Sequence, residues 1–253
     1  MSRNFKVGVF LIIAILTTTF TFYFWQIFKT PNLQAKKQTN FVLLIPEGGT
    51  FQSVIDTLNK HDVISDQISF RFLAKFLKYT EQVKPGRYVI EPDMTNYRAI
   101  DKLKSGVQDP VRLTFNNIRL KEDLLNRIGG RFAFGEQKLR EAMSDPAVCQ
   151  KYGMDTTTIV AMFLPNTYDI FWTVSTEKFL DRMHSEYKKY WTPERLAKAN
   201  AVGLTPIQVS ILASIVEEEQ ARKVDERAKV AGLYLNRLKA NMPLQADPTI
   251  KFA

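Results

Sequence analysis

The feature that most limits how this chain can fold is an uncharged, apolar run near its N-terminus. No charged residue occurs from Val7 to Phe28, and about 22 residues are enough for a helix to cross a bilayer. Residues 22–25 are all aromatic, as in the aromatic belt of a membrane surface. We therefore expect a transmembrane anchor over 7–28, a cytoplasmic tail over 1–6 and a polar tether over 29–40.

A cleaved signal peptide is the alternative to an anchor. The apolar run is too long for an ordinary signal-peptide core, and no Ala-x-Ala-like cleavage site follows it. Arg3 and Lys6 favour a cytoplasmic N-terminus, although Lys29, Lys36 and Lys37 on the far side offset that preference. A short tail before a large domain favours tail inside and body outside. We expect a single-pass protein of the inner membrane with its body on the extracytoplasmic side.

Composition restricts the chemistry that the body can perform. The 253 residues carry a formal net charge of +9, which favours an anionic partner: lipid headgroups, an acidic polymer or nucleic acid. The basic residues are dispersed, without a basic-aromatic groove, so nucleic acid is the least favoured of the three. Cys149 is the single cysteine, and His61 and His184 lack zinc-type spacing, so we expect no disulfide, metal or cofactor.

The pattern beyond the tether predicts an α+β fold in two parts. Residues 41–115 have the pattern of a small module of strands and helices. Strands are expected over 41–45, 87–90 and 111–115, and helices after Thr50, from Gln67 and over 96–104. Residues 116–253 read as mostly helical, interrupted by a rigid break at 163–168.

A helix near the C-terminal end carries three consecutive carboxylates, Glu217 to Glu219. Thr205-Pro206-x-Gln208 marks its start, with an N-cap threonine and a capping-box glutamine. At about 100° per residue, Glu219 points along the apolar stripe, whereas Glu217 points nearly opposite. A carboxyl group on a face meant for burial resists ionisation, which suits a general acid. The alternative is a solvated face with i,i+4 ion pairs. The stripe comprises Val209, Ile211, Leu212, Ile215 and Val216.

The next helix is expected to begin near Asp225 and to carry Arg237 on its apolar face, with Val230, Leu233, Tyr234 and Leu238. An arginine there either snorkels to solvent or binds a substrate carboxylate. The segment 242–249 reads as an ordered turn.

Four segments, in this order, resemble the endolytic murein transglycosylase family, which includes YceG-like proteins. They are Pro165-x-Thr167-Tyr168, Ala213-Ser-Ile-Val-Glu-Glu-Glu219, Asn236-Arg237-Leu238 and Leu244-Gln245-x-Asp247-Pro248-Thr249. The resemblance implies a LysM-like module over 41–115 and a lytic-transglycosylase-like catalytic domain over 116–253. It implies a lyase that cleaves nascent peptidoglycan strands between MurNAc and GlcNAc and leaves 1,6-anhydro-MurNAc ends.

The resemblance also assigns roles to residues. The Glu-x-Glu pair of the family maps onto Glu217 and Glu219, with Glu219 as the catalytic acid. The expected substrate-binding residues are Tyr168, Asn236, Arg237, Gln245, Asp247 and Thr249, most of which suit hydrogen bonds to sugar hydroxyl and acetamido groups.

The family domain continues beyond the Asp-Pro-Thr segment with a Tyr-Asn-Thr-Tyr-like motif, whereas this sequence ends at Ala253. We therefore expect an incomplete catalytic domain. A non-catalytic, membrane-anchored cell-wall binding or scaffold protein is the alternative function. The expected partners are peptidoglycan glycan strands, the inner membrane and wall-synthesis enzymes.

Overall fold

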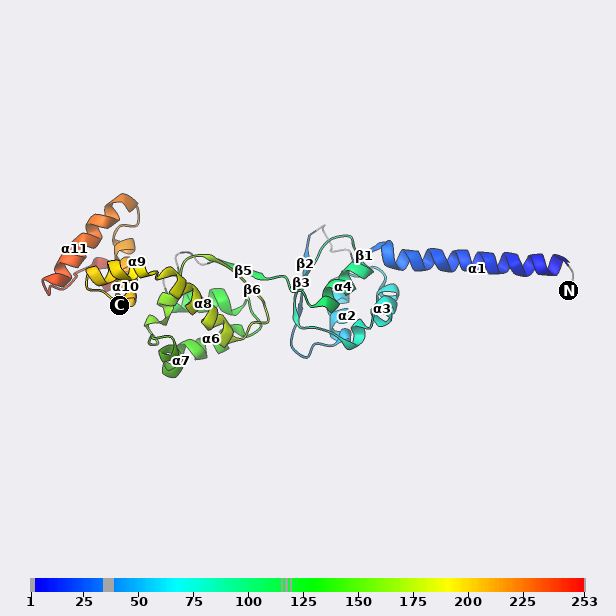
Figure 1. Cartoon of the computed structure of the whole chain (residues 1–253), viewed down its shortest axis with the longest axis horizontal. Coiled ribbons are helices and arrows are strands. Elements are labelled where there is room, and N and C mark those ends of the chain that lie inside the picture. Colours follow the sequence, from blue (N-terminus) through cyan, green and yellow to red (C-terminus); the bar gives the residue numbers. More distant parts are fainter. Residues whose placement is uncertain (1–2, 34–38, 115, 117, 119, 253) are drawn as a thin grey trace. The chain divides into compact units, whose positions relative to one another are not determined.

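The computed structural model describes residues 3–33, 39–114, 116, 118 and 120–252 (Figure 1). It mixes helices with small sheets, as the sequence indicated. The chain divides into two compact units. The N-terminal unit comprises Met1–Leu113, Arg131–Phe134 and Tyr168–Val174, and the C-terminal unit comprises Thr114–Gly130, Gly135–Thr167 and Ser175–Ala253.

The N-terminal unit begins with the long helix α1 (Arg3–Lys29). It has 27 residues, its most apolar 18-residue stretch has a mean hydropathy of 2.1, and by length and composition the helix is sufficient to cross a membrane. The expected apolar helix is therefore present.

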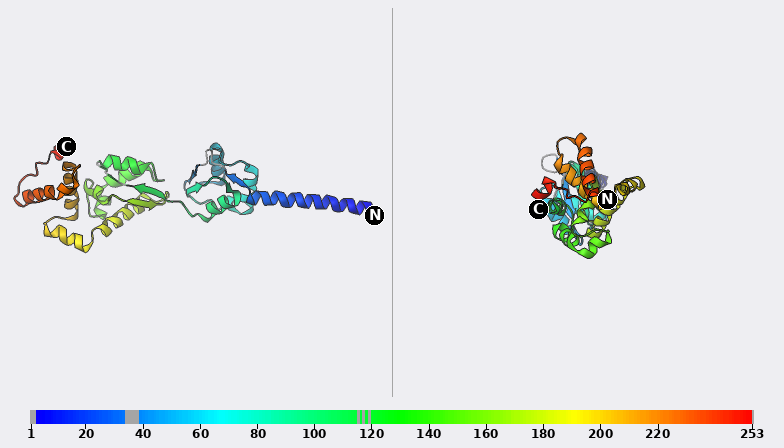
Figure 2. Two further views of the ribbon diagram at one scale, coloured as in Figure 1. Left: turned by 90° about the horizontal axis from the view of Figure 1, so that it is seen from above. Right: turned by 90° about the vertical axis from the view of Figure 1, so that its left-hand side faces the viewer.

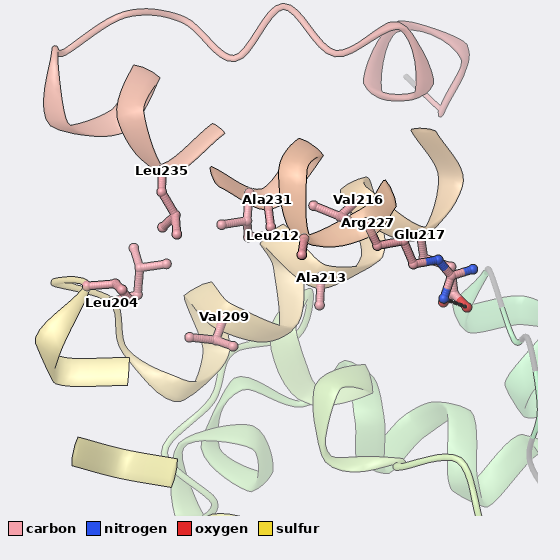
Figure 3. A pocket seen from close by; sticks show the side chains of 11 residues that line it. Leu204, Val209, Leu212, Ala213, Val216, Glu217, Arg227, Ala231 and Leu235 are labelled. Atoms are coloured by element: carbon pink, nitrogen blue, oxygen red, sulfur yellow. Dashed lines mark ion pairs between the residues drawn. The ribbon is translucent and has the colours of Figure 1, made fainter. Parts of the chain in front are cut away.

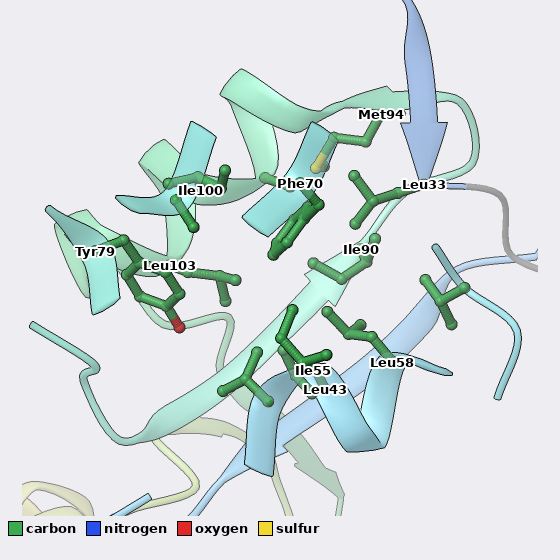
Figure 4. Packing of buried hydrophobic residues seen from close by; sticks show 14 of the residues in the cluster. Leu33, Leu43, Ile55, Leu58, Phe70, Tyr79, Ile90, Met94, Ile100 and Leu103 are labelled. Atoms are coloured by element: carbon green, nitrogen blue, oxygen red, sulfur yellow. The ribbon is translucent and has the colours of Figure 1, made fainter. Parts of the chain in front are cut away.

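A two-stranded antiparallel sheet and three helices form the core of this unit. Strand β2 (Phe41–Ile45) pairs with β3 (Gly86–Ile90), with Phe41 opposite Ile90. Their inward-facing side chains pack with those of α2 (Phe51–Lys60), α3 (Gln67–Phe76) and α4 (Asn96–Ser105), as Figure 4 shows. Alternation in the strands and the threonine N-cap of α2 had indicated these elements.

The end of α1 is built into this core rather than separated from it. Ile27 is buried in the core, and Leu33 is completely buried. Leu33 belongs to the short strand β1 (Pro31–Leu33), which pairs with β4 (Met94–Thr95). The expectation of a polar tether over 29–40 is therefore wrong for residues 31–33, because one of them fills the core. Residues 34–38 of that tether lie outside the described residues.

Three buried polar side chains connect the segments at this junction. The Asn32 amide donates to Asn96 Oδ1 at 2.7 Å and to the Asp66 carbonyl at 2.8 Å. The Asn96 amide donates to Ser69 Oγ at 3.0 Å and to the Ile27 carbonyl at 3.4 Å. Because buried polar groups are costly when unpaired, this network fixes how α1, α3 and α4 meet.

Strand β5 (Val111–Thr114) was expected, although Phe115 at its end lies outside the described residues. Its partner is β6 (Thr167–Ile170), a strand that begins within the segment expected to be a rigid break. The intervening and following helices are α5 (Lys121–Gly129), α6 (Gly135–Ser144), α7 (Pro146–Lys151), α8 (Thr176–Tyr190) and α9 (Pro193–Ala201).

The last three helices carry the residues singled out by the sequence. Helix α10 (Pro206–Glu219) begins with the predicted capping box: Gln208 N donates to Thr205 Oγ1 at 3.3 Å, and Thr205 N donates to Gln208 Oε1 at 2.8 Å. Such a cap contributes about 1 kcal/mol. Helix α11 (Arg227–Lys239) packs against α10 (Figure 2). Residues from Asp247 onwards form the short helix α12 (Asp247–Phe252), where a turn had been expected.

Candidate active site

Helix α10 does not bury Glu219. Its buried residues are Leu212 and Val216, whereas Ile211 is 48% exposed and Glu219 is exposed. Glu219 is the last residue of α10, about one turn beyond Val216, so its side chain lies past the packed part of the helix although it points close to the direction of Leu212. The sequence-based expectation of a buried Glu219 is therefore wrong, and its side chain is accessible to a large ligand.

Glu219 nevertheless lies close enough to the buried Tyr234 of α11 to affect its ionisation. Tyr234 is 4% exposed and packs with Leu212, Val216 and Ala246. Burial raises the pKa of Tyr234, and Glu219 raises it further through its negative charge and as a hydrogen-bond partner of the hydroxyl. The phenol therefore keeps its proton and can act as a hydrogen-bond donor.

Two more of the predicted site residues lie within electrostatic reach of Tyr234. The positive charge of Arg237 lowers the pKa of Tyr234, and the negative charge of Asp247 raises it. The Tyr234 cluster, defined as Glu219, Tyr234, Arg237 and Asp247, thus combines side chains from α10, α11 and α12. The sequence had placed Tyr234 on the packing face of its helix and had not assigned it to the site. One feature of the sequence did link Tyr234 to the site: it lies three residues before Arg237, which places the two side chains on the same face of a helix.

Arg237 holds the loop between α11 and α12. Its Nη1 donates to the carbonyls of Pro243 at 3.2 Å and Leu244 at 2.6 Å, and to Gln245 Oε1 at 3.0 Å. Gln245 has a φ of 53°, a left-handed conformation that costs energy in a side chain larger than glycine. Arg237 thus does not snorkel freely: its Nη1 positions the loop.

Helix α12 brings Asp247 to the cluster. The preceding Ala246 is 1% exposed and packs in the same apolar cluster as Tyr234, which anchors the start of the helix. Asp247 is exposed. The Thr249 hydroxyl donates to the Ala246 carbonyl at 2.6 Å, so this side chain stabilises the first turn.

Two predicted substrate-binding residues lie elsewhere. Asn236 is exposed two positions after Tyr234, which places it about 200° around α11 from the tyrosine. Tyr168 lies on β6 in the N-terminal unit and is 4% exposed. Tyr168 therefore has little surface with which to contact a sugar. Neither Tyr168 nor Asn236 belongs to the Tyr234 cluster as defined above.

Glu217 lies on the other flank of α10, beside a largely apolar pocket of about 490 Å³ (Figure 3). It forms an ion pair with Arg227 at 3.5 Å, and Arg227 Nε also donates to the Gln220 carbonyl at 3.0 Å. This pair therefore ties the end of α10 to the start of α11. The pocket is lined by Val202, Leu204, Val209, Leu212, Ala213, Val216, Glu217, Arg227, Ala228, Ala231 and Leu235.

Within the described part of the chain, no group of three or more His, Cys, Asp or Glu side chains is arranged to hold a metal ion. The chemistry available at the Tyr234 cluster is proton transfer by carboxyl groups and hydrogen bonding to a polar ligand.

Arg237→Lys should loosen the loop over 242–249. Lysine keeps the positive charge, but its ammonium cannot take the position from which Arg237 Nη1 contacts all three acceptors. Losing one net hydrogen bond of about 1 kcal/mol speeds local amide exchange about fivefold. Hydrogen–deuterium exchange of peptides covering 242–249 measures this, with the exposed Arg222→Lys as the matched control. Unchanged exchange in Arg237→Lys would show that the loop does not depend on this side chain.

The sequence of this chain is similar to those of known enzymes. The endolytic murein transglycosylase of Streptococcus pneumoniae serotype 2 is 26% identical over 235 residues, 83% of this chain and 42% of that protein. The endolytic murein transglycosylase of Bacillus subtilis strain 168 is 25% identical over 238 residues, 87% of this chain and 65% of that protein. The chain thus spans less than half the length of the pneumococcal relative.

A solved structure of a YceG-like protein from Listeria monocytogenes matches with a TM-score of 0.48 and 23% identity, covering 83% of this chain and 74% of that one. The sequence profile of the YceG-like family matches residues 43–253. That match includes the module, the capped helix α10 and the Tyr234 cluster. The chain therefore belongs to the YceG-like family.

Proposed function

We propose that this protein is an endolytic murein transglycosylase, a lyase that cleaves nascent peptidoglycan strands between MurNAc and GlcNAc. The names of the pneumococcal and Bacillus relatives support this activity. The observation that carries the proposal is the Tyr234 cluster. It joins an accessible carboxyl group, Glu219, to a buried phenol donor and to Asp247 and Arg237 from two other family-like segments.

Glu219 serves as a single acid and base in this reaction. The protonated carboxyl group donates its proton to the glycosidic oxygen as the bond from that oxygen to the anomeric carbon of MurNAc breaks. The C6 hydroxyl oxygen of the same MurNAc bonds to the anomeric carbon, and its proton passes to the Glu219 carboxylate. The products are a strand with a free GlcNAc hydroxyl and a strand with a 1,6-anhydro-MurNAc end, and no water is consumed.

The surroundings of Glu219 suit this exchange. The Glu219 carboxyl group is exposed, so a glycan strand can lie over it. When the carboxyl group ionises, the Tyr234 hydroxyl is in place to donate to the new charge. Arg237 positions the loop that carries Gln245, and Gln245 and Asp247 are exposed and suited to binding sugar hydroxyl groups.

Glu217 has a supporting role. Hydrolytic glycosidases place two carboxyl groups on either side of one glycosidic bond. On α10, residues two apart point about 200° away from each other, and Glu217 pairs with Arg227 while Glu219 faces Tyr234. This division favours one reacting carboxyl group over a Glu217–Glu219 pair.

Glu219→Gln should keep the fold and lower the rate of strand cleavage by roughly two to four decades, because the transferable proton is lost. Glu218→Gln is the matched control and should change the rate little, with Glu217→Gln between the two. The assay is digestion of uncrosslinked glycan strands with the products identified by mass.

Three results would contradict this assignment. Anhydro-ended products from Glu219→Gln at the unmutated rate would exclude Glu219 as the acid. Products with reducing ends from the unmutated protein would indicate hydrolysis instead. Glycan binding without any cleavage by the unmutated protein would favour the cell-wall binding or scaffold function.

We further propose that residues 41–115 form a LysM-like module and that 116–253 belong to the catalytic domain. The order of strand β2, helices α2 and α3 and strand β3, with the two strands paired, supports the LysM-like assignment. In this scheme α1 is a single-pass anchor in the inner membrane. The parts of both units that follow α1 lie on the extracytoplasmic side, where they meet nascent strands and the enzymes that make them.

Protease added to spheroplasts should digest everything beyond α1, because the tail before it is short and carries Arg3 and Lys6. Immunoblotting for the region beyond residue 29 measures this, with an endogenous cytoplasmic protein as the control that must stay intact. Protection of that region in intact spheroplasts, with digestion only after lysis, would reverse the proposed orientation.

A further inference from the structure

Helix α3 has an apolar face that the N-terminal unit does not cover. Ile68, Phe72 and Phe76 are spaced four residues apart and are 77%, 49% and 60% exposed. The opposite side of the helix is already buried in the core through Phe70 and Leu73. Three large apolar side chains in a row on the solvent side of a helix indicate a surface that contacts something apolar.

This exposed face continues onto the end of α1. The Phe76 ring lies 6.4 Å from the ring of Phe24 and 6.4 Å from that of Phe28. Phe28 in turn lies 6.2 Å from Tyr97 of α4, which is 44% exposed. Aromatic side chains from three helices thus form one continuous surface beside the anchor.

The junction keeps this surface in place. Ile27 is buried in the core one residue before Phe28, and its carbonyl accepts a hydrogen bond from buried Asn96 at 3.4 Å. Strand β1 then pairs with β4 directly after α1. The helix and the exposed face of α3 therefore belong to one packed body, and α3 stays next to α1.

The position of this aromatic surface along α1 indicates which part of a membrane it would meet. The uncharged run from Val7 to Phe28 is about 33 Å long at 1.5 Å per residue, close to the roughly 30 Å of the hydrocarbon layer. Phe24 lies five residues before Lys29, or about 7.5 Å below the charged end. Phe76, in contact with Phe24, is therefore at the boundary between hydrocarbon and headgroups.

We propose that the exposed face of α3, with Tyr97, docks on the membrane surface next to α1. The aromatic rings lie at the acyl boundary, and the exposed Lys75 on the same side of α3 contacts anionic lipid headgroups. This inference rests on the membrane-inserted anchor proposed above. It gives the module a fixed orientation, so that β2 and β3 stand at a set position above the bilayer.

Nitroxide labels on the full-length chain in vesicles of phosphatidylethanolamine and phosphatidylglycerol test this. A label at Phe72→Cys reports on the docked face, one at Leu16→Cys on the anchor, and one at Val107→Cys, a 69% exposed apolar position of the same unit, on water. The native Cys149 is buried, so the unmutated chain gives the labelling background.

Docking predicts that the label at 72 collides with oxygen and is shielded several-fold from a water-soluble nickel chelate relative to the label at 107. A label at 72 that is as accessible to nickel as the one at 107, while the label at 16 lies in the bilayer, would overturn the docking and leave the anchor intact. A nickel-accessible label at 16 would instead overturn the anchor, and the docking with it.

A second set of variants separates lipid from protein as the covering partner. With the label moved to Ile68→Cys, replacing Phe72 and Phe76 by serine should raise nickel accessibility several-fold, whereas Val107→Ser should not. Both sets of positions are exposed, so the fold should survive. The same label can be measured in detergent without lipid. If it is shielded from nickel there, and only when two chains associate, a second copy of the chain covers the surface and the proposal is overturned.

Discussion

The buried Tyr234 is the contact on which the candidate site depends. Its ring packs with Leu212, Val216 and Ala246, and the negative charge of Glu219 raises the pKa of its hydroxyl. An exposed carboxyl group at the end of a helix has no fixed direction of its own. Burial of the tyrosine supplies that direction, because the phenol is held by packing and not by the flexible side chain that it contacts.

In the N-terminal unit, a small α+β module is attached to an apolar helix. Among the described residues, the end of α1 is packed onto the module: Ile27 enters the core, and Asn32, Ser69 and Asn96 hydrogen-bond one another where the segments meet. A flexible tether would let the module turn freely. The packed joint gives it one orientation relative to the helix axis. That orientation places the aromatic face of α3 beside α1.

Local chemistry allowed much of this fold to be predicted. The capping box at Thr205, the alternation in β2 and the apolar run of α1 each depend on neighbouring residues alone, and all are present. The predicted burial of Glu219 was wrong because it is the last residue of α10, and whether α11 and α12 cover that end depends on tertiary packing. The pairing of β5 with β6 and the burial of Leu33 likewise join residues distant in sequence. Glu219, Arg237 and Asp247, which the sequence had proposed as site residues, all affect the pKa of Tyr234, a residue that the sequence had not assigned to the site.

The most direct test of the account is whether Tyr234 acts through Glu219. Strand-cleavage rates of the unmutated protein, Tyr234→Phe, Glu219→Gln and the double variant form a double-mutant cycle. Removing a hydroxyl that donates to a charged group costs about tenfold or more in rate. We predict this loss for Tyr234→Phe in the unmutated background and no further loss once Glu219 is glutamine. The same fractional loss in both backgrounds would show that the two residues act independently and would contradict the account.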